Sequence, residues 1–126
     1  MWICRILNCH EGATLVNPEF IAKTYTLDWD NITLDECLYR LHFIRKNHSN
    51  TKKLEYRLSP SKTGFHVRAR LHGNACIPRL RMEFWDDPRR LLHDIFNRPD
   101  NIHDVLWDRK RIKGKIYEAG EWITYD

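Results

Sequence analysis

Two aspartates in the first third of the chain have the spacing of a metal-binding pair. Asp28 and Asp30 lie within Tyr25–Asp30, a segment that alternates apolar and polar residues as a strand with one buried face does. Residues two apart on a strand project from the same face, roughly 6 to 7 Å apart at their α-carbons. Carboxylates so placed suit Mg²⁺ or Mn²⁺ in phosphoryl transfer. The alternative is that Asp30-Asn31 forms a turn before a helix.

A polar loop followed by a histidine has the residue types of a phosphate site. The loop Ser59–Gly64 offers hydroxyls, an ammonium group and backbone N–H groups through Ser61, Lys62 and Thr63. Donors of this kind bind phosphate oxygens. We expect His66, just after the loop, to contact a triphosphate or to orient a nucleotide. The alternative is an ordinary strand histidine.

A third acid is expected near the end of the segment Arg79–Trp85. Glu83 has the phase of the polar strand face, whereas Asp86 lies at the strand end, where a side chain faces the mouth of a site. Asp87 precedes a proline and is the expected N-cap of a helix. We favour Asp86 and leave Glu83 open. The predicted catalytic residues are therefore Asp28, Asp30, His66 and Asp86, and the predicted metal ligands are Asp28, Asp30 and Asp86.

The positive charge of the chain is concentrated in its middle. Residues 40–81 hold eleven Lys or Arg and a single acid, Glu55, although the net charge of the whole chain is only +4. Such asymmetry favours an anionic partner: DNA, RNA or a nucleotide. The alternative is solvated surface charge. The arginines expected to hold phosphates are Arg68, Arg70, Arg79 and Arg81.

The hydrophobic patterns predict an alternation of strands and helices along the chain. The predicted strands are Trp2–Leu7, Lys23–Asp30, Lys53–Leu58, Phe65–His72, Arg79–Trp85 and a closing strand at Lys115–Tyr117 or Trp122–Tyr125. One helix begins with the capping box Thr33–Glu36 and ends near Asn47–Asn50. A second begins at Asp87-Pro88 and stops at Arg98-Pro99.

This order predicts an α+β fold in one domain, residues 1–126. We expect a two-layer sandwich of the ferredoxin or RRM type, with an antiparallel or mixed sheet and two helices on one face. The helices would bury apolar strand residues, namely Leu27, Tyr56, Val67, Ala69, Leu80 and Met82. The opposite face stays exposed and carries Asp28, Asp30, His66 and Arg68.

The composition favours an intracellular protein. No stretch reaches the roughly 18 to 20 uncharged apolar residues of a membrane span. The start, Met1–Leu7, has Arg5 within its apolar run and no signal-peptide cleavage site. The cysteines are scattered and predicted to be free, and Cys37 falls on the apolar side of a helix. The absence of glutamine favours a thermophilic source.

The order of these motifs resembles the archaeo-eukaryotic primase superfamily, whose catalytic core is an RRM-like sheet. The family's motifs would fall on Leu27–Asp30, on Ser61–His66 and on Glu83 or Asp86. The resemblance implies that the acids bind metal and that His66 contacts the incoming nucleotide. The chain also looks like small orphan proteins encoded by archaeal viruses and plasmids, which would place it in the host cytoplasm.

Different functions remain open on the sequence alone. One is a minimal primase-like palm that uses a divalent metal for nucleotidyl transfer. Another is a nucleic-acid-binding module without catalysis, in which Phe65, Trp29 or Trp85 stacks on bases. The third is a non-catalytic viral structural or interaction protein. The oligomeric state is also left open.

Overall fold

The computed structural model describes residues 20–97 and 106–126. Its helices are α2 (Leu34–Asn47), α3 (Ile77–Glu83) and α4 (Pro88–Asn97). Its strands are β1 (Ile21–Trp29), β2 (Thr51–Leu58), β3 (Phe65–Cys76), β4 (Arg109–Ile112), β5 (Lys115–Glu118) and β6 (Ile123–Thr124). The predicted strand Trp2–Leu7, the helix stop at Arg98-Pro99, Cys4 and Cys9 lie outside the described residues.

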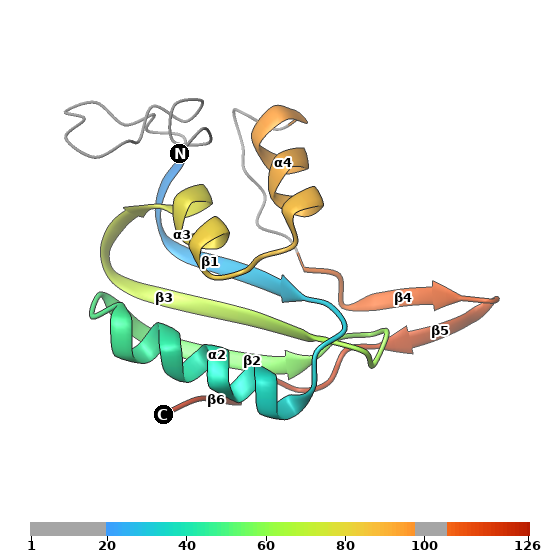
Figure 1. Ribbon diagram of the computed structural model, residues 1–126. Coiled ribbons are helices and arrows are strands. Elements are labelled where there is room, and N and C mark those ends of the chain that lie inside the picture. The colour runs from blue at the N-terminus through green and yellow to red at the C-terminus, as the bar shows by residue number, and fades with distance from the viewer. Residues whose placement is uncertain (1–19, 98–105) are drawn as a thin grey trace.

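The main sheet has the strand order β1-β3-β2-β6, and every pairing in it is antiparallel. Because β1 and β2 both run antiparallel to the intervening β3, they are parallel to each other and form a split β-α-β unit around α2. Figure 1 shows α2 along one face of this sheet and the separate β4–β5 hairpin extending from its end. The predicted α+β sandwich is confirmed.

The register gives the sheet one apolar and one polar face. Leu27 on β1 lies opposite Val67 on β3, which lies opposite Tyr56 on β2. The next row along the strands, on the other face, is Asp28, His66 and Arg57. Successive strand residues point to opposite faces. The predicted period-two phase is therefore correct, and Asp28 and His66 are direct neighbours across β1 and β3.

Helix α2 covers the apolar face as its sequence predicts. The Thr33 side chain accepts a hydrogen bond from the Glu36 N–H at 3.2 Å, which satisfies one of the free donors at the helix start. Along the helix Cys37, Leu41 and Ile44 are fully buried against the sheet. Their spacing of three or four residues puts them on one helix face.

The prediction of a strand at Arg79–Trp85 is wrong. The segment Ile77–Glu83 is helix α3, with Pro78 in its first turn, where the missing N–H costs nothing. Ile77, Leu80 and Phe84 are buried in the core with the residues of α2 and the sheet. Their i, i+3, i+7 spacing is helical, and the short alternation of arginines with Leu80 and Met82 concealed it.

Helix α4 takes a different position from α2 and α3. It packs on α3, and its Arg90 donates hydrogen bonds to the carbonyl and the hydroxyl of Thr26 on the edge strand β1. Leu91 and Ile95 are buried there, outside the main core cluster. Figure 1 shows α4 beside α3 and the β1 edge of the sheet, away from α2.

Both regions proposed for a closing strand are strands in the structure. Lys115–Glu118 pairs with Arg109–Ile112 in the hairpin, and Ile123–Thr124 adds to β2 in the main sheet. In the two described parts of the chain, no helix is long and apolar enough to cross a membrane.

Candidate metal and phosphate site

A cavity of about 390 Å³ opens at the end of the sheet where β1 ends and β3 begins. Acidic and imidazole groups, a hydroxyl-bearing loop and a basic segment line it. The lining residues are Asp28, Asp30 and His66, then Ser59, Pro60 and Ser61, then Trp107, Arg109, Lys110 and Arg111. Three segments distant in sequence thus bring carboxylates and cations into one cavity.

An aspartate cluster stands at this cavity and could hold a metal ion. It consists of Asp28, Asp30 and Asp87, which offer carboxylate oxygens within 4.8 Å of one another. Asp28 is half-buried at the end of β1, and Asp30 is exposed just beyond it. Asp87 comes from the start of α4, where its carboxylate also accepts the Arg89 N–H at 3.0 Å. The predicted N-cap is therefore confirmed, and the same carboxylate joins the cluster.

The electrostatic surroundings of Asp28 suit a cation-binding site. Burial, the largest cause, and the neighbouring carboxylates of Asp30, Asp86 and Asp87 raise the pKa of Asp28, and Arg90 opposes them. The net result is a pKa of about 6. The Oδ1 atom of Asp28 is buried and accepts no hydrogen bond within the described structure. Oxygen atoms in this state fit a divalent cation, which would satisfy them and relieve the repulsion among the carboxylates.

The imidazole of His66 is neutral and has a hydrogen-bond donor at Nε2. The Arg57 guanidinium donates from Nε to Nδ1 of His66 at 3.1 Å, so Nδ1 is the acceptor and the ring proton lies on Nε2. Burial and the positive charges of Arg57 and Arg90, opposed by Asp108, together lower the pKa of His66 to about 4. Nε2 is 3.8 Å from Asp28 Oδ1, too far for a hydrogen bond. The contact is not an ion pair at neutral pH, because the imidazole carries no charge.

The prediction that His66 is solvent-exposed is wrong, although its face of the sheet is correct. Its side chain is only 5% exposed. The Arg57 side chain lies beside it and forms an ion pair with Asp108 at 2.9 Å. The Trp122 ring stacks on both Arg57 and Arg68, whose guanidinium carbons lie 4.4 and 4.2 Å from the ring centroid. The C-terminal part of the chain thus covers this end of the polar face.

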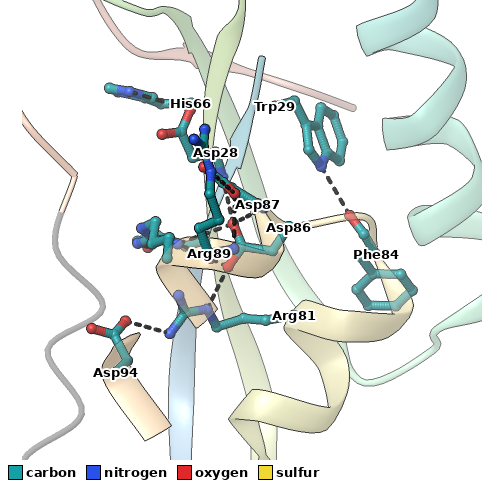
Figure 2. A network of polar contacts seen from close by, with 11 residues as sticks. Asp28, Trp29, His66, Arg81, Phe84, Asp86, Asp87, Arg89 and Asp94 are labelled. Atoms are coloured by element: carbon teal, nitrogen blue, oxygen red, sulfur yellow. Dashed lines mark hydrogen bonds and ion pairs between the residues drawn. The ribbon is translucent and has the colours of Figure 1, made fainter. Parts of the chain in front are cut away.

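Asp86, the predicted third acid, is an internal ion-pair partner and not part of the aspartate cluster. Its carboxylate contacts Arg81 at 2.7 Å and Arg90 at 3.0 Å, and it accepts the backbone N–H groups of Asp28 at 2.8 Å and Asp87 at 2.9 Å. Figure 2 shows this network beneath Asp28. Asp86 was expected at the end of a strand, facing the mouth of the site. It instead follows helix α3, in a connection to α4 that turns back into the protein. Asp86 positions two residues of the cluster.

Arg81 is likewise buried, which corrects its assignment as a phosphate-binding residue. Its side chain has no exposed surface and donates to Asp86 and, at 2.9 Å, to Asp94 on α4. This arginine joins α3 to α4 and is out of reach of a nucleic acid (Figure 2). Arg79 and Glu83 lie exposed on α3 and do not share the polar face of the sheet.

The structure separates the residues of the predicted phosphate loop. Ser61 lines the cavity, and its hydroxyl lies 3.0 Å from those of Ser59 and Thr63. Lys62 instead donates its ammonium to the Glu118 carbonyl at 2.8 Å, which ties the loop to β5. The loop therefore contributes hydroxyls to the cavity, while Lys62 supports the neighbouring hairpin.

The arginines of β3 differ from each other in their surroundings. Arg68 forms a two-bond pair with Glu55, at 2.8 and 3.3 Å, in addition to its stacking on Trp122. Arg70 is exposed at the other end of the polar face, where it lines a separate pocket with Lys23 and Lys52. Neither lines the cavity that holds Asp28.

The sequence interpretation missed several residues of the site. Asp87 was assigned only a capping role. Arg57 has the strand phase of His66 across the Ser59–Gly64 turn, so the hairpin register could have identified it. The position of the basic run Arg109–Arg111 and Trp107 depends on long-range packing, for which the sequence carries no local signal.

Comparison with known proteins returned no match: no protein-family model, no curated protein and no solved structure is similar to this chain.

Proposed function

We propose that the cavity is a divalent-metal-dependent nucleotide site that supports primase-like nucleotidyl transfer. The observation that carries the proposal is the composition of one cavity of about 390 Å³, in which an aspartate pair faces a basic run. Carboxylates alone would repel a phosphate, and arginines alone would bind it without metal. Their combination is typical of sites that bind a metal–phosphate complex.

The aspartate cluster supplies the metal ligands in this proposal. Asp28, Asp30 and Asp87 would hold Mg²⁺ or Mn²⁺, which prefer carboxylate oxygens. When bound, the ion supplies neutralisation of phosphate charge and alignment of the attacking and leaving oxygens. Asp86 acts indirectly, since its bonds to the backbone of Asp28 and Asp87 hold two of the ligands in place.

The other lining residues would bind the phosphates and the base. His66 offers its Nε2–H to a phosphate oxygen, and its neutral state is maintained by burial and by Arg57. Ser61 and the basic run Arg109–Arg111 supply further donors. The Trp107 side chain is 75% exposed beside the cavity. Stacking of a base on such a ring contributes roughly 1 to 3 kcal/mol.

The proposal is tested by thermal unfolding with millimolar Mn²⁺ or Mg²⁺, with and without a nucleoside triphosphate. We expect the ion to raise the unfolding temperature, and the triphosphate to raise it further only when the ion is present. A ligand at 100 times its Kd stabilises a fold by about 2.7 kcal/mol, which such an experiment resolves easily. Asp28→Asn should remove the effect of the ion.

The matched control is Asp35→Asn, an exposed aspartate in the first turn of α2. This variant should keep the full metal response. Equal responses in both variants, or no response of the wild type to either ion, would refute the metal site. Template-dependent incorporation of a labelled nucleotide, absent in Asp28→Asn, then tests the transfer reaction itself.

A further inference from the structure

The β4–β5 hairpin forms a two-stranded sheet of its own beside the cavity. Its strands, Arg109–Ile112 and Lys115–Glu118, pair with each other and not with the main sheet. Six of its eight strand residues are exposed, and only Ile112 and Tyr117 are partly covered. Figure 1 shows the hairpin projecting from the end of the sheet. It is therefore an arm and not a layer of the core.

The arm is strongly basic. It carries five cations, Arg109, Lys110, Arg111, Lys113 and Lys115, against one acid, Glu118. Glu118 lies 3.6 Å from Arg109, and both side chains are 71% exposed. This single weak pair leaves most of the positive charge of the arm uncompensated.

The cations lie on both faces of the arm. Arg109 and Arg111 share one face, because they alternate along β4. Lys110 and Lys115 share the other, since Lys110 lies opposite Tyr117 and the Lys115 ammonium lies 5.6 Å from that ring. A hairpin that lay flat on a membrane or on an acidic protein would need cations on one face only. Cations on both faces fit a groove with phosphates on each side.

The tip of the arm has an unusual residue for its conformation. Lys113 and Gly114 both have positive φ, 51° and 78°, and they form the two-residue connection between paired Ile112 and Lys115. This is the type I′ geometry, in which Asn or Asp normally precedes Gly. Lys113 therefore occupies a position whose backbone conformation disfavours lysine, and it places an ammonium group at the tip of the arm.

The base of the arm is fixed to the rest of the protein. The Ala119 N–H donates to the Asp108 carbonyl at 2.8 Å, and the Gly120 N–H donates to the Leu58 carbonyl at 2.9 Å. Arg57 holds the Asp108 carboxylate, and Lys62 donates to the Glu118 carbonyl. Arg57, which donates a hydrogen bond to His66, thus also helps to orient the arm through Asp108. An arm held at its base keeps a defined direction from the cavity.

We propose that the β4–β5 arm inserts into the major groove of B-form DNA and guides a duplex to the cavity. The major groove is about 12 Å wide and about 8.5 Å deep, and it admits a two-stranded ribbon. Strands of four residues at about 3.4 Å each give a ribbon on the order of 14 Å long, enough to reach the groove floor. The delivery of DNA to the cavity rests on the proposed function, whereas the binding of the arm to DNA needs no metal.

The test is the binding of a fluorescent 20-base-pair DNA duplex followed by anisotropy in EDTA, at several salt concentrations. The test variant is the double substitution Lys113→Asn, which keeps the turn conformation, and Lys115→Thr, which keeps the strand propensity. Each lost phosphate contact lowers the slope of log K against log salt by about 0.9. We expect the slope to fall by about 2 and the affinity to fall about tenfold or more.

The matched control is Lys46→Ala, an exposed lysine of α2. It should bind the duplex as the wild type does. Equal binding by the arm variant and the wild type would overturn the proposal. So would equally tight binding of an RNA duplex, because the A-form major groove is too narrow for the arm.

The arm and the metal site can fail separately. Asp28→Asn should lose the metal response and keep metal-free duplex binding, whereas the arm variant should show the reverse. If the wild type does not respond to the metal but binds the duplex, the proposed function is refuted and the DNA-binding role of the arm stands. If the wild type responds to the metal but does not bind the duplex, the DNA-binding role of the arm is refuted and the metal site stands.

Discussion

At the scale of single residues, Asp28 and His66 form a pair whose shifts in pKa have opposite signs. Burial and the neighbouring carboxylates raise the pKa of Asp28 to about 6, while burial and Arg57 lower the pKa of His66 to about 4. Between these values the folded protein therefore holds a proton on the carboxyl group and none on the imidazole. In the unfolded chain the proton would lie on the histidine.

These opposite shifts predict that the pair adds little pH dependence to the stability of the metal-free wild type. Ionisation of Asp28 lowers the free energy of unfolding as the pH rises through about 6, and protonation of His66 lowers it as the pH falls through about 4. Each group alone gives a slope of at most about 1.4 kcal/mol per pH unit. In the wild type the slopes cancel between these pH values.

Substitution of either residue should reveal the pH dependence of the free energy of unfolding that the other residue causes. In Asp28→Asn the free energy of unfolding should rise with pH between about 4 and 6.5, because only His66 remains. In His66→Gln it should fall with rising pH between about 4 and 6. Urea denaturation at a series of pH values in EDTA measures both. Parallel pH profiles for the two variants would show that one of the assigned shifts is wrong.

Arg81 allows a test of the internal ion-pair network. Removal of its guanidinium leaves the buried Asp86 without its closest partner, at 2.7 Å, and removes the bond to Asp94. Loss of one partner from a buried ion pair costs about 3 to 5 kcal/mol. Arg81→Met should therefore lose that much free energy of unfolding in chemical denaturation. The control Lys46→Met, at an exposed position of α2, should change it by about 0.5 kcal/mol or less.

At the scale of elements, the patterns with strong local signals were predicted correctly from the sequence. The capping box at Thr33, the turn before Phe65 and the alternation along β3 each depend on neighbouring residues. Helix α3 was not predicted, because its buried Arg81 occupies a position that sequence patterns assign to the surface. Only the contacts with Asp86 and Asp94, from outside the helix, make that burial favourable.

The turn between β2 and β3 shows how one element positions the site. Gly64 packs against the backbone of β1, and a Cβ added there would lie only 2.9 Å from the Asp30 α-carbon. The Ile32 N–H also donates to the Thr63 carbonyl at 3.2 Å. The glycine of the turn is thus required for close approach and places the loop against Asp30.

Gly64→Ala should therefore destabilise the protein and impair the metal site together. The added methyl group meets backbone atoms, which cannot move aside independently, so we expect a loss of about 1 to 3 kcal/mol and a weaker thermal response to Mn²⁺. Gly73→Ala is the matched control, since its nearest contact is an ordinary 3.7 Å and neither glycine has positive φ. Similar losses in the two variants would contradict this role of Gly64.

At the scale of the whole molecule, the sequence predicted one side of the site and not the other. Asp28, Asp30 and His66 were placed together because two neighbouring strands carry them in matching phase. Asp87 joins Asp28 and Asp30 from the start of α4, and the basic run reaches the cavity from β4. Their positions depend on how the last third of the chain folds back over the sheet, which periodicity does not specify.

The central claim is that a divalent ion binds between Asp28, Asp30 and Asp87 and holds a phosphate facing the basic run. A crystal structure with Mn²⁺ and a non-hydrolysable nucleoside triphosphate, analysed by anomalous scattering at the manganese edge, tests it most directly. We predict an anomalous peak within coordination distance of these carboxylates, at roughly 2.0 to 2.3 Å, with the triphosphate beside Arg109–Arg111. The absence of a peak there at saturating Mn²⁺, or a nucleotide bound away from this cavity, would contradict the account.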